Sequence, residues 1–180
     1  MTDAKAYRGA QLSHLTNAIG VYALCDLDQV PIYVGQSVDG IRTRVRRHLT
    51  SARSDIVANR QIDVWEIAYV WAWPVAEIGQ IGALEQQLFY DFDSETPLMN
   101  GRIFEAPLIR TDVPDRQSVQ IITEAERLDR SRPALRLPRQ ISQYLTLVDY
   151  IQNVKDAPHL KRSLAAHFDR LVKYHATFLQ

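Results

Sequence analysis

Two short β-prone runs near the start of the chain flank a polar turn. The runs cover residues 20–24 (GVYAL) and 31–35 (PIYVG), and the turn between them carries two aspartates. Short stretches rich in Val, Ile and Tyr on either side of acidic turn residues are typical of a β-hairpin. The pattern predicts this hairpin and, before it, a short helix over residues 8–16.

A basic helix is predicted over residues 39–52, directly after the hairpin. Apolar residues recur there at helical spacing, at positions 41, 45, 49 and 52. At about 100° per residue, Arg44 and His48 fall together on one flank of this apolar stripe. This edge of the helix is therefore cationic and able to face a cleft, while three other arginines point further out: Arg42, Arg46 and Arg47.

The next periodic stretches predict a strand over residues 64–73 and a helix over residues 74–92 that begins with Pro74. All three tryptophans lie on one face of the predicted strand. A row of aromatic rings can stack on nucleic-acid bases, but packing in a core or between subunits is the commoner use.

Glu85 lies near the centre of the inward face that the 74–92 helix is predicted to bury. The other residues of that face are apolar or small: Ile78, Ile81, Gly82, Leu88 and Phe89. Desolvating a carboxylate costs several kcal/mol unless a cation or strong donors compensate. Either an arginine such as Arg44 pairs with Glu85, or Glu85 faces a cleft and binds a metal ion.

After a turn at residues 97–101, which contains Asn100, and an irregular segment at 107–114, helical patterns return. They cover residues 117–130, 139–153 and 158–178. The order of elements predicts an α/β fold of the α+β kind, with a small mixed or antiparallel sheet flanked by helices and a C-terminal helical extension. We divide the chain into an N-terminal helical arm (1–16), a core (17–104) and the extension (105–180).

The composition is that of a globular protein with a single domain. Of the 180 residues, 46% are hydrophobic and 23% are charged, and no apolar run has the roughly 18 residues that a membrane span requires. The N-terminal stretch lacks the pattern of a secretory signal, and Cys25 is the only cysteine. We therefore expect a cytoplasmic protein without membrane partners.

A net charge of zero hides an asymmetry along the chain. Residues 1–130 carry 13 basic and 18 acidic side chains, whereas residues 131–180 carry 8 basic and 3 acidic ones. Within the acidic part, the stretch 42–60 holds six arginines and only Asp55 as an acid. Such a patch suits a phosphate backbone, although a charged helix face is often simply solvated.

The candidate chemical groups fit the hydrolysis of a phosphodiester. That reaction needs an activated water, positive charge around the phosphorus and help for the departing oxygen. Two phenols on adjacent strands, an arginine and a histidine one helical turn apart, one inward glutamate and a turn asparagine provide a set of this kind. An arginine binds phosphate oxygens through two parallel donors, and a carboxylate suits a hard divalent cation.

Five of these features follow one another as in a known family. The tripeptides at 20–22 (GVY) and 33–35 (YVG) resemble the two signature tripeptides of the GIY-YIG nuclease family. Arg44, Glu85 and Asn100 then stand where that family has its helical arginine, its metal-binding glutamate and its late asparagine. Valine replaces the central isoleucine of both tripeptides, and glutamine follows the second one where many members have a lysine.

The resemblance covers residues 17–103 and implies DNA hydrolysis with one Mg²⁺ or Mn²⁺ ion per active site. The pairing of Arg44 with His48 resembles the restriction-endonuclease branch of that family, where a histidine often occupies this place. The implied roles are Tyr22 as general base, Tyr33 as a hydroxyl near the phosphate, Arg44 as phosphate clamp, His48 as assistant to the tyrosine or the leaving group, Glu85 as metal ligand, and Asn100 as organiser. Four residues are left to hold DNA: Gln36, Arg42, Arg46 and Arg47.

Three functions remain open at this point. The first is a sequence-specific type II restriction endonuclease acting on double-stranded DNA, with a homodimer expected because twofold symmetry suits a palindrome. The second is a less specific nuclease of repair, phage or mobile-element function. The third is a catalytically inactive DNA-binding module. The basic extension is expected to bind DNA or to form the dimer.

Overall fold

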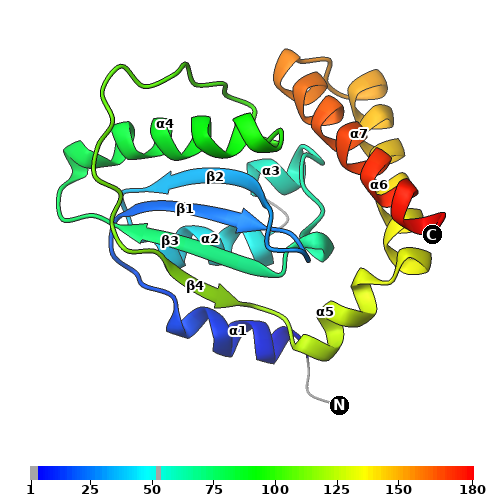
Figure 1. The fold of residues 1–180 in the computed structure, drawn as a ribbon, viewed down its shortest axis with the longest axis horizontal. Coiled ribbons are helices and arrows are strands. Elements are labelled where there is room, and N and C mark those ends of the chain that lie inside the picture. Colours follow the sequence, from blue (N-terminus) through cyan, green and yellow to red (C-terminus); the bar gives the residue numbers. More distant parts are fainter. Residues whose placement is uncertain (1–3, 52–53) are drawn as a thin grey trace.

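The computed structural model describes residues 4–51 and 54–180, which form an α+β fold around one sheet (Figure 1). The strands are β1 (Gly20–Cys25), β2 (Pro31–Ser37), β3 (Tyr69–Pro74) and β4 (Gln117–Gln120). The helices are α1 (Ala4–His14), α2 (Ile41–Thr50), α3 (Asp55–Ala58), the single 3-10 turn η1 (Val64–Glu66), α4 (Ile78–Glu95), α5 (Glu124–Ser131), α6 (Pro133–Asn153) and α7 (Pro158–Phe178).

The predicted hairpin forms one side of an antiparallel sheet with the strand order β2-β1-β3-β4, in which β1 is central and β2 lies at the edge. Tyr22 on β1 lies opposite Gly35 on β2 and Ala72 on β3. Strand β1 is buried along its whole length because it has a neighbour on each side and helices on both faces. The sheet prediction is therefore confirmed in its antiparallel form.

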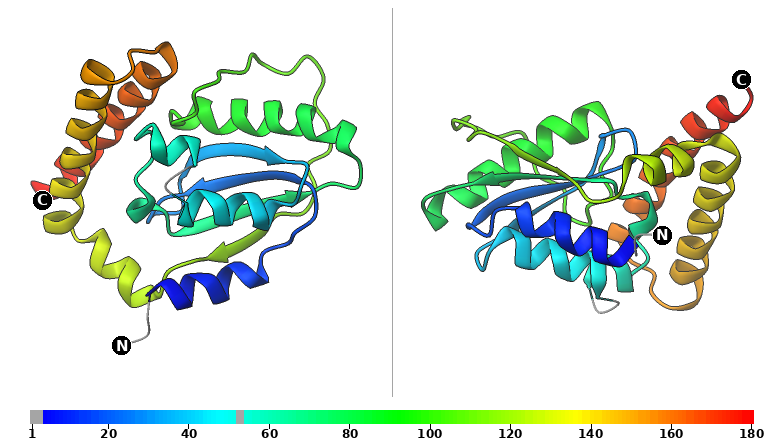
Figure 2. Two further views of the ribbon diagram at one scale, coloured as in Figure 1. Left: turned by 180° about the vertical axis from the view of Figure 1, so that it is seen from behind. Right: turned by 90° about the horizontal axis from the view of Figure 1, so that it is seen from below.

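Helix α4 covers one face of the sheet, and α1 and α2 cover the other (Figure 2). Alternation along β1 divides its side chains between the two layers, because neighbouring residues of a strand point to opposite faces. Tyr22 and Leu24 pack with α1 and α2, whereas Val21 and Ala23 pack with α4. The tryptophans Trp71 and Trp73 pack against Phe92 of α4, which confirms core packing for these two rings.

Several predicted boundaries are wrong. Residues 64–66 form η1 and not a strand, because the Asp63 side chain accepts a hydrogen bond from the Trp65 N–H and caps the turn. Pro74 ends β3, and α4 begins four residues later, after a capping box on Glu77. The start of the predicted 117–130 helix is the edge strand β4, whose pairing with β3 is a long-range contact that helical periodicity does not register.

Two other helix predictions need correction. Helix α6 begins at Pro133 and not at residue 139, with Pro133 in the first helical turn, where its missing N–H costs nothing. Ile78 was predicted to face the core with the rest of its helix face, but it stands in the exposed first turn of α4 and is 64% exposed. Among the described residues, no helix combines the length and the apolar character that crossing a membrane requires.

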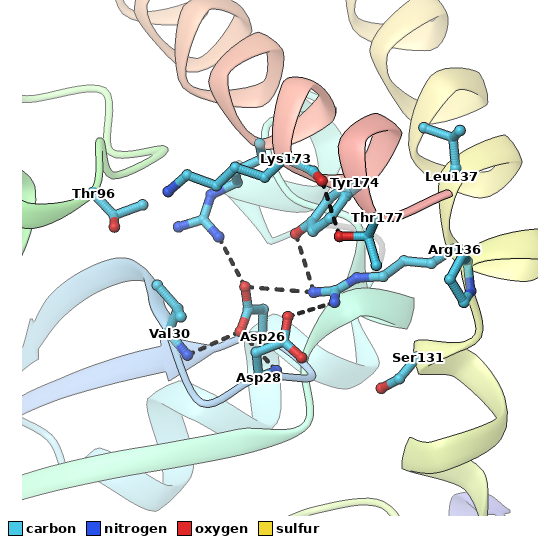
Figure 3. A pocket seen from close by; sticks show the side chains of 12 residues that line it. Asp26, Asp28, Val30, Thr96, Ser131, Arg136, Leu137, Lys173, Tyr174 and Thr177 are labelled. Atoms are coloured by element: carbon cyan, nitrogen blue, oxygen red, sulfur yellow. Dashed lines mark hydrogen bonds and ion pairs between the residues drawn. The ribbon is translucent and has the colours of Figure 1, made fainter. Parts of the chain in front are cut away.

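The helical extension docks on the core through buried charged groups. Helices α6 and α7 pack side by side at the end of the sheet where the β1–β2 turn lies (Figure 1). Arg136 of α6 forms an ion pair with Asp28 on that turn (Figure 3). It forms another with Glu66 of η1. Arg170 of α7 donates to Asp26 at 2.9 Å.

Further polar contacts complete this network. Glu66 also accepts hydrogen bonds from Gln140 at 3.0 Å and from the Tyr174 hydroxyl at 3.1 Å. Arg139 forms a double contact with Asp63. Much of the charge asymmetry in the sequence is thus used within the molecule, where basic side chains of the extension bind acidic side chains of the core.

Replacing Arg136 tests how much this network contributes to the stability of the fold. Arg136→Gln leaves the buried Glu66 carboxylate without its cation, whereas Asp26 keeps Arg170, so we expect the free energy of unfolding to fall by about 3–5 kcal/mol. Urea denaturation measures the loss. Arg132→Gln is the matched control, because Arg132 and its partner Asp129 are 64% and 58% exposed and such pairs contribute at most about 1 kcal/mol. Equal losses in the two variants would contradict the docking role of Arg136.

Candidate active site

The candidate site is a cavity of about 280 Å³ along the free edge of β2, where the α4 layer meets the α2 and α3 layer. Tyr33 and Gln36 come from β2, Glu85 comes from α4, and Asn100 comes from the loop after α4. The sequence separates these residues by up to 67 positions. The fold thus brings four of the predicted site residues to one hollow.

Asn100 holds the loop that closes this edge. Its side-chain oxygen accepts the Val34 N–H at 3.0 Å, and its side-chain amide donates to the Val34 carbonyl at 2.6 Å. The Met99 N–H donates to the carbonyl of Ile32, two residues before Val34 on β2. The amide therefore pairs with β2 as another strand would, and both of its polar groups are occupied. This geometry makes Asn100 an organiser of the cleft.

Tyr22 lies beneath the cavity and not in its wall. It has no exposed surface, and its hydroxyl makes a 2.8 Å hydrogen bond with Nε2 of His48. Nδ1 of His48 lies 2.5 Å from the Ser54 hydroxyl. The rings of Tyr22, Tyr33 and His48 form a cluster with centroids 5.9 to 6.3 Å apart, and Tyr33 is the member that reaches the cavity.

Gly35 makes room for the two tyrosines. A Cβ atom on Gly35 would lie 2.6 Å from the Tyr22 hydroxyl oxygen and 2.9 Å from Cε1 of Tyr33, which is closer than packed atoms approach. Gly20 at the other end of the hairpin has a φ of 150°, and a Cβ there would lie 2.2 Å from the Trp73 carbonyl oxygen. Both signature glycines thus meet a steric requirement of this fold.

Burial sets the charge states of Tyr22 and His48. Burial, assisted by the charge of Arg44, lowers the pKa of His48 to about 4. Burial also raises the pKa of Tyr22 well above its usual value. Both side chains are therefore neutral at pH 7. In the tautomer with its proton on Nδ1, His48 has a free lone pair at Nε2 to accept the Tyr22 proton.

Arg44 offers unused hydrogen-bonding capacity next to this cluster. Its Nε–H is buried and has no hydrogen-bond partner within residues 4–51 and 54–180. Arg44 and Arg47 line two further hollows, and the larger of these, about 440 Å³, is shared with His48 and Asp55. Asp55 also lines the cavity of Glu85, so the hollows adjoin. An anionic group placed here would meet a guanidinium with a donor to spare.

Glu85 is the buried carboxylate without a local cation. It is 9% exposed, and among the described residues it makes no hydrogen bond or ion pair, so the predicted pairing with Arg44 is not formed. Burial raises the pKa of Glu85, and the more distant charge of Arg102 offsets this only in part. A carboxylate in this state suits a hard divalent cation that keeps water ligands.

The donor set allows such an ion through Glu85 alone. The part of the chain that the structure describes holds no group of three or more His, Cys, Asp or Glu side chains arranged for a metal. A cation bound by Glu85 would therefore complete its shell with water and phosphate oxygens, as Mg²⁺ does in many phosphate sites. The residues present fit one ion of this kind.

The outer residues that were assigned to DNA binding have separate surroundings. Gln36 is exposed and lines the cavity of Glu85, and Arg47 borders the hollows of Arg44. The Arg42 guanidinium donates to the Ser13 carbonyl at the end of α1. Arg46 points to a groove between α1 and α2. Arg42 and Arg46 are thus not part of the cavity that holds Glu85.

Three ionisable residues of the cavity wall are absent from the sequence-based assignment. They are Asp55 on α3, Arg102 after the asparagine turn, and His159 in the first turn of α7. Arg102 stands two residues after Asn100, so its closeness to the predicted turn was the only indication in the sequence that it lies near the site. Nothing in the local sequence points to His159, because the packing of α7 on the core is a long-range contact.

Comparisons with models of protein families, with curated proteins and with solved structures gave no match to this chain.

Burial of neutral His48 predicts a specific loss of stability in mild acid. An unfolded histidine takes up a proton near pH 6.5, whereas folded His48 resists protonation down to about pH 4. The contribution is fully present above pH 6.5 and is lost as the pH falls. Between pH 7 and pH 5 it amounts to about 2 kcal/mol.

Urea denaturation of wild type and His48→Gln at both pH values measures this term, and we expect the decrease from pH 7 to pH 5 to be smaller in the variant by that amount. His175→Gln, at an exposed position on α7, should behave as wild type. An unchanged decrease in His48→Gln would show that His48 is not buried in its neutral form.

Proposed function

We propose that this chain is a divalent-metal-dependent DNA endonuclease of the GIY-YIG type, and more narrowly a type II restriction endonuclease acting on double-stranded DNA as a homodimer. The observation that carries the proposal is the unpaired Glu85 carboxylate in one cavity with Tyr33 and Asn100, beside the hollow of Arg44. The restriction assignment rests on the resemblance of the Arg44 and His48 pair to that branch.

Arg44 holds the scissile phosphate in this proposal. A guanidinium places two parallel N–H donors against two phosphate oxygens, and negative charge on these oxygens grows as the phosphorus is attacked. The free Nε–H of Arg44 supports this role, because that donor has no other partner among the described residues. Arg47, which is exposed on the same helix, contributes charge to the same hollow.

The base is the hydrogen-bonded pair of Tyr22 and His48. Neutral His48 accepts the Tyr22 proton at Nε2 while the Tyr22 oxygen accepts a proton from the attacking water. The geometry supports this exchange because the Tyr22 hydroxyl and Nε2 of His48 lie 2.8 Å apart, within hydrogen-bond distance. Ser54 fixes the ring through Nδ1. The alternative in which His48 helps the leaving group is disfavoured, because both of its nitrogens are occupied.

Glu85 holds the divalent cation, and Asn100 keeps the cleft open beside it. When bound, the cation supplies positive charge to the phosphate and to the departing oxygen. Glu85 lines the cavity from α4, so its carboxylate faces the space where the cation would bind. Tyr33 borders the phosphate with its hydroxyl, and Gln36 contacts the DNA at the mouth of the cavity.

Glu85→Gln should abolish metal-dependent cleavage, because the amide keeps the size of the side chain but loses the charge that binds the cation. We expect the rate of plasmid and phage DNA cleavage with Mg²⁺ or Mn²⁺ to fall by about 1,000-fold. Glu95→Gln, an exposed position on the same helix, is the matched control and should keep full activity.

The pattern of products separates the three functions. Discrete fragments that EDTA abolishes support a restriction endonuclease, whereas a metal-dependent smear supports the less specific nuclease. DNA binding without cleavage under either metal would overturn both enzymatic readings and leave the inactive DNA-binding module.

Arg44→Lys tests the phosphate clamp. Lysine keeps the charge but cannot offer two parallel donors, so we expect the cleavage rate to fall by about 100-fold with little loss of DNA affinity. Arg46→Lys on the opposite side of α2 should have almost no effect. Single-turnover cleavage and a gel-shift titration make the comparison, and equal effects of the two substitutions would argue that Arg44 only attracts DNA.

A further inference from the structure

The first turn of α7 forms part of the wall of the candidate cavity. His159, the second residue of that helix, is half-buried and lines the same hollow as Tyr33, Glu85 and Asn100. Its ring lies against Gly101, where a Cβ atom would meet Cβ of His159 at 3.0 Å and Cγ and Cδ2 at 3.4 Å. The extension therefore brings an imidazole into a cleft otherwise built from the core.

The side chain of His159 is unused within the protein. Neither of its ring nitrogens has a hydrogen-bond partner within residues 4–51 and 54–180, although its backbone carbonyl accepts from Ser163. The contrast with His48 is informative, because both nitrogens of that ring are occupied by Tyr22 and Ser54. The ring nitrogens of His159 are therefore available to hydrogen-bond a ligand in the cavity.

Contacts of the next turn of α7 fix where His159 stands. The Arg162 guanidinium bonds Asp93 of α4 at 2.5 Å and the carbonyl of Asn100 at 3.1 Å, and it also bonds the carbonyl of Leu98. The Ser163 hydroxyl donates to the Met99 carbonyl at 2.9 Å. Helix α7 thus holds three successive carbonyls of the loop that carries Asn100, so His159 and Asn100 keep a fixed relation.

In the proposed reaction, none of the residues assigned so far donates a proton to the departing oxygen. Attack by water forms a new P–O bond, and the proton released passes to Tyr22 and His48. The bond between phosphorus and the departing oxygen breaks, its electron pair stays on that oxygen, and the oxygen needs a proton. The Tyr22 and His48 pair accepts a proton and Arg44 stabilises charge, so neither supplies this step.

We propose that His159 is a further catalytic residue, which donates a proton to the departing oxygen of the scissile phosphodiester. This inference rests on the proposed nuclease function. The neutral imidazole left after the step takes a proton back from solvent, which the half-exposed position of the ring allows. The helical extension then belongs to the active site itself, in addition to any part that it has in DNA binding or dimerisation.

A substrate with a better leaving group tests this step. A duplex carrying the cleavage site mapped on plasmid DNA is prepared with either oxygen or sulfur at the bridging leaving position. A thiolate departs without protonation, so an acid catalyst matters only for the oxygen substrate. We expect His159→Ala to slow single-turnover cleavage of the oxygen substrate by about 100-fold and that of the sulfur substrate by less than about fivefold, both with Mn²⁺.

The controls separate the possible failures. His175→Ala on the exposed part of α7 should leave both rates unchanged, and His159→Gln should match His159→Ala, since glutamine fills the space but is not an acid. Equal slowing of both substrates would overturn proton donation and leave His159 a structural residue. An unaffected oxygen substrate would overturn any role. If the wild-type protein cleaves neither substrate while it binds DNA, the nuclease proposal itself has failed, and the inference falls with it.

Discussion

The amide of Asn100 pairs with both backbone groups of Val34, and the arrangement of the candidate site depends on this pairing. An edge strand has a row of unpaired N–H and C=O groups, which folded proteins normally cover. Here one side chain satisfies the middle of that edge and ties the 97–101 loop to β2. The cavity with Tyr33 and Glu85 lies beside this tie.

The loop is held from its other side by α7. Arg162 and Ser163 bind its carbonyls, and Arg170 and Arg136 anchor the two helices to Asp26 and Glu66 on the core. Buried charges of this kind are costly when left single, so each arginine requires its acidic partner in place. The extension and the core therefore act as one unit at the site.

Burial affects the ionisable groups differently on the two sides of the site. On the α2 side it keeps Tyr22 and His48 neutral, and the two side chains share a 2.8 Å hydrogen bond. On the α4 side it leaves the Glu85 carboxylate short of solvent and of a local cation, which is the condition for binding one. Tyr33 on β2 connects the two environments, because its ring packs with Tyr22 and His48 and also lines the cavity of Glu85.

The sequence by itself determined the hairpin, the basic helix after it, the α+β class and the candidate residues that share the cavity, because each depends on local periodicity or on a short motif. It located Glu85 on a buried helix face for the same reason.

Only the tertiary structure decided how these groups are used. The edge strand β4, the free carboxylate of Glu85, the buried position of Tyr22 and the presence of His159 in the cavity all depend on contacts between residues far apart in the chain. The basic tail is the clearest case. Its composition indicated a surface for an acidic partner, and the fold supplies acidic partners from within, since Arg136 and Arg170 pair with buried carboxylates once both helices are packed. Periodicity reports which face of an element is apolar, but it carries no information on which distant element that face will meet.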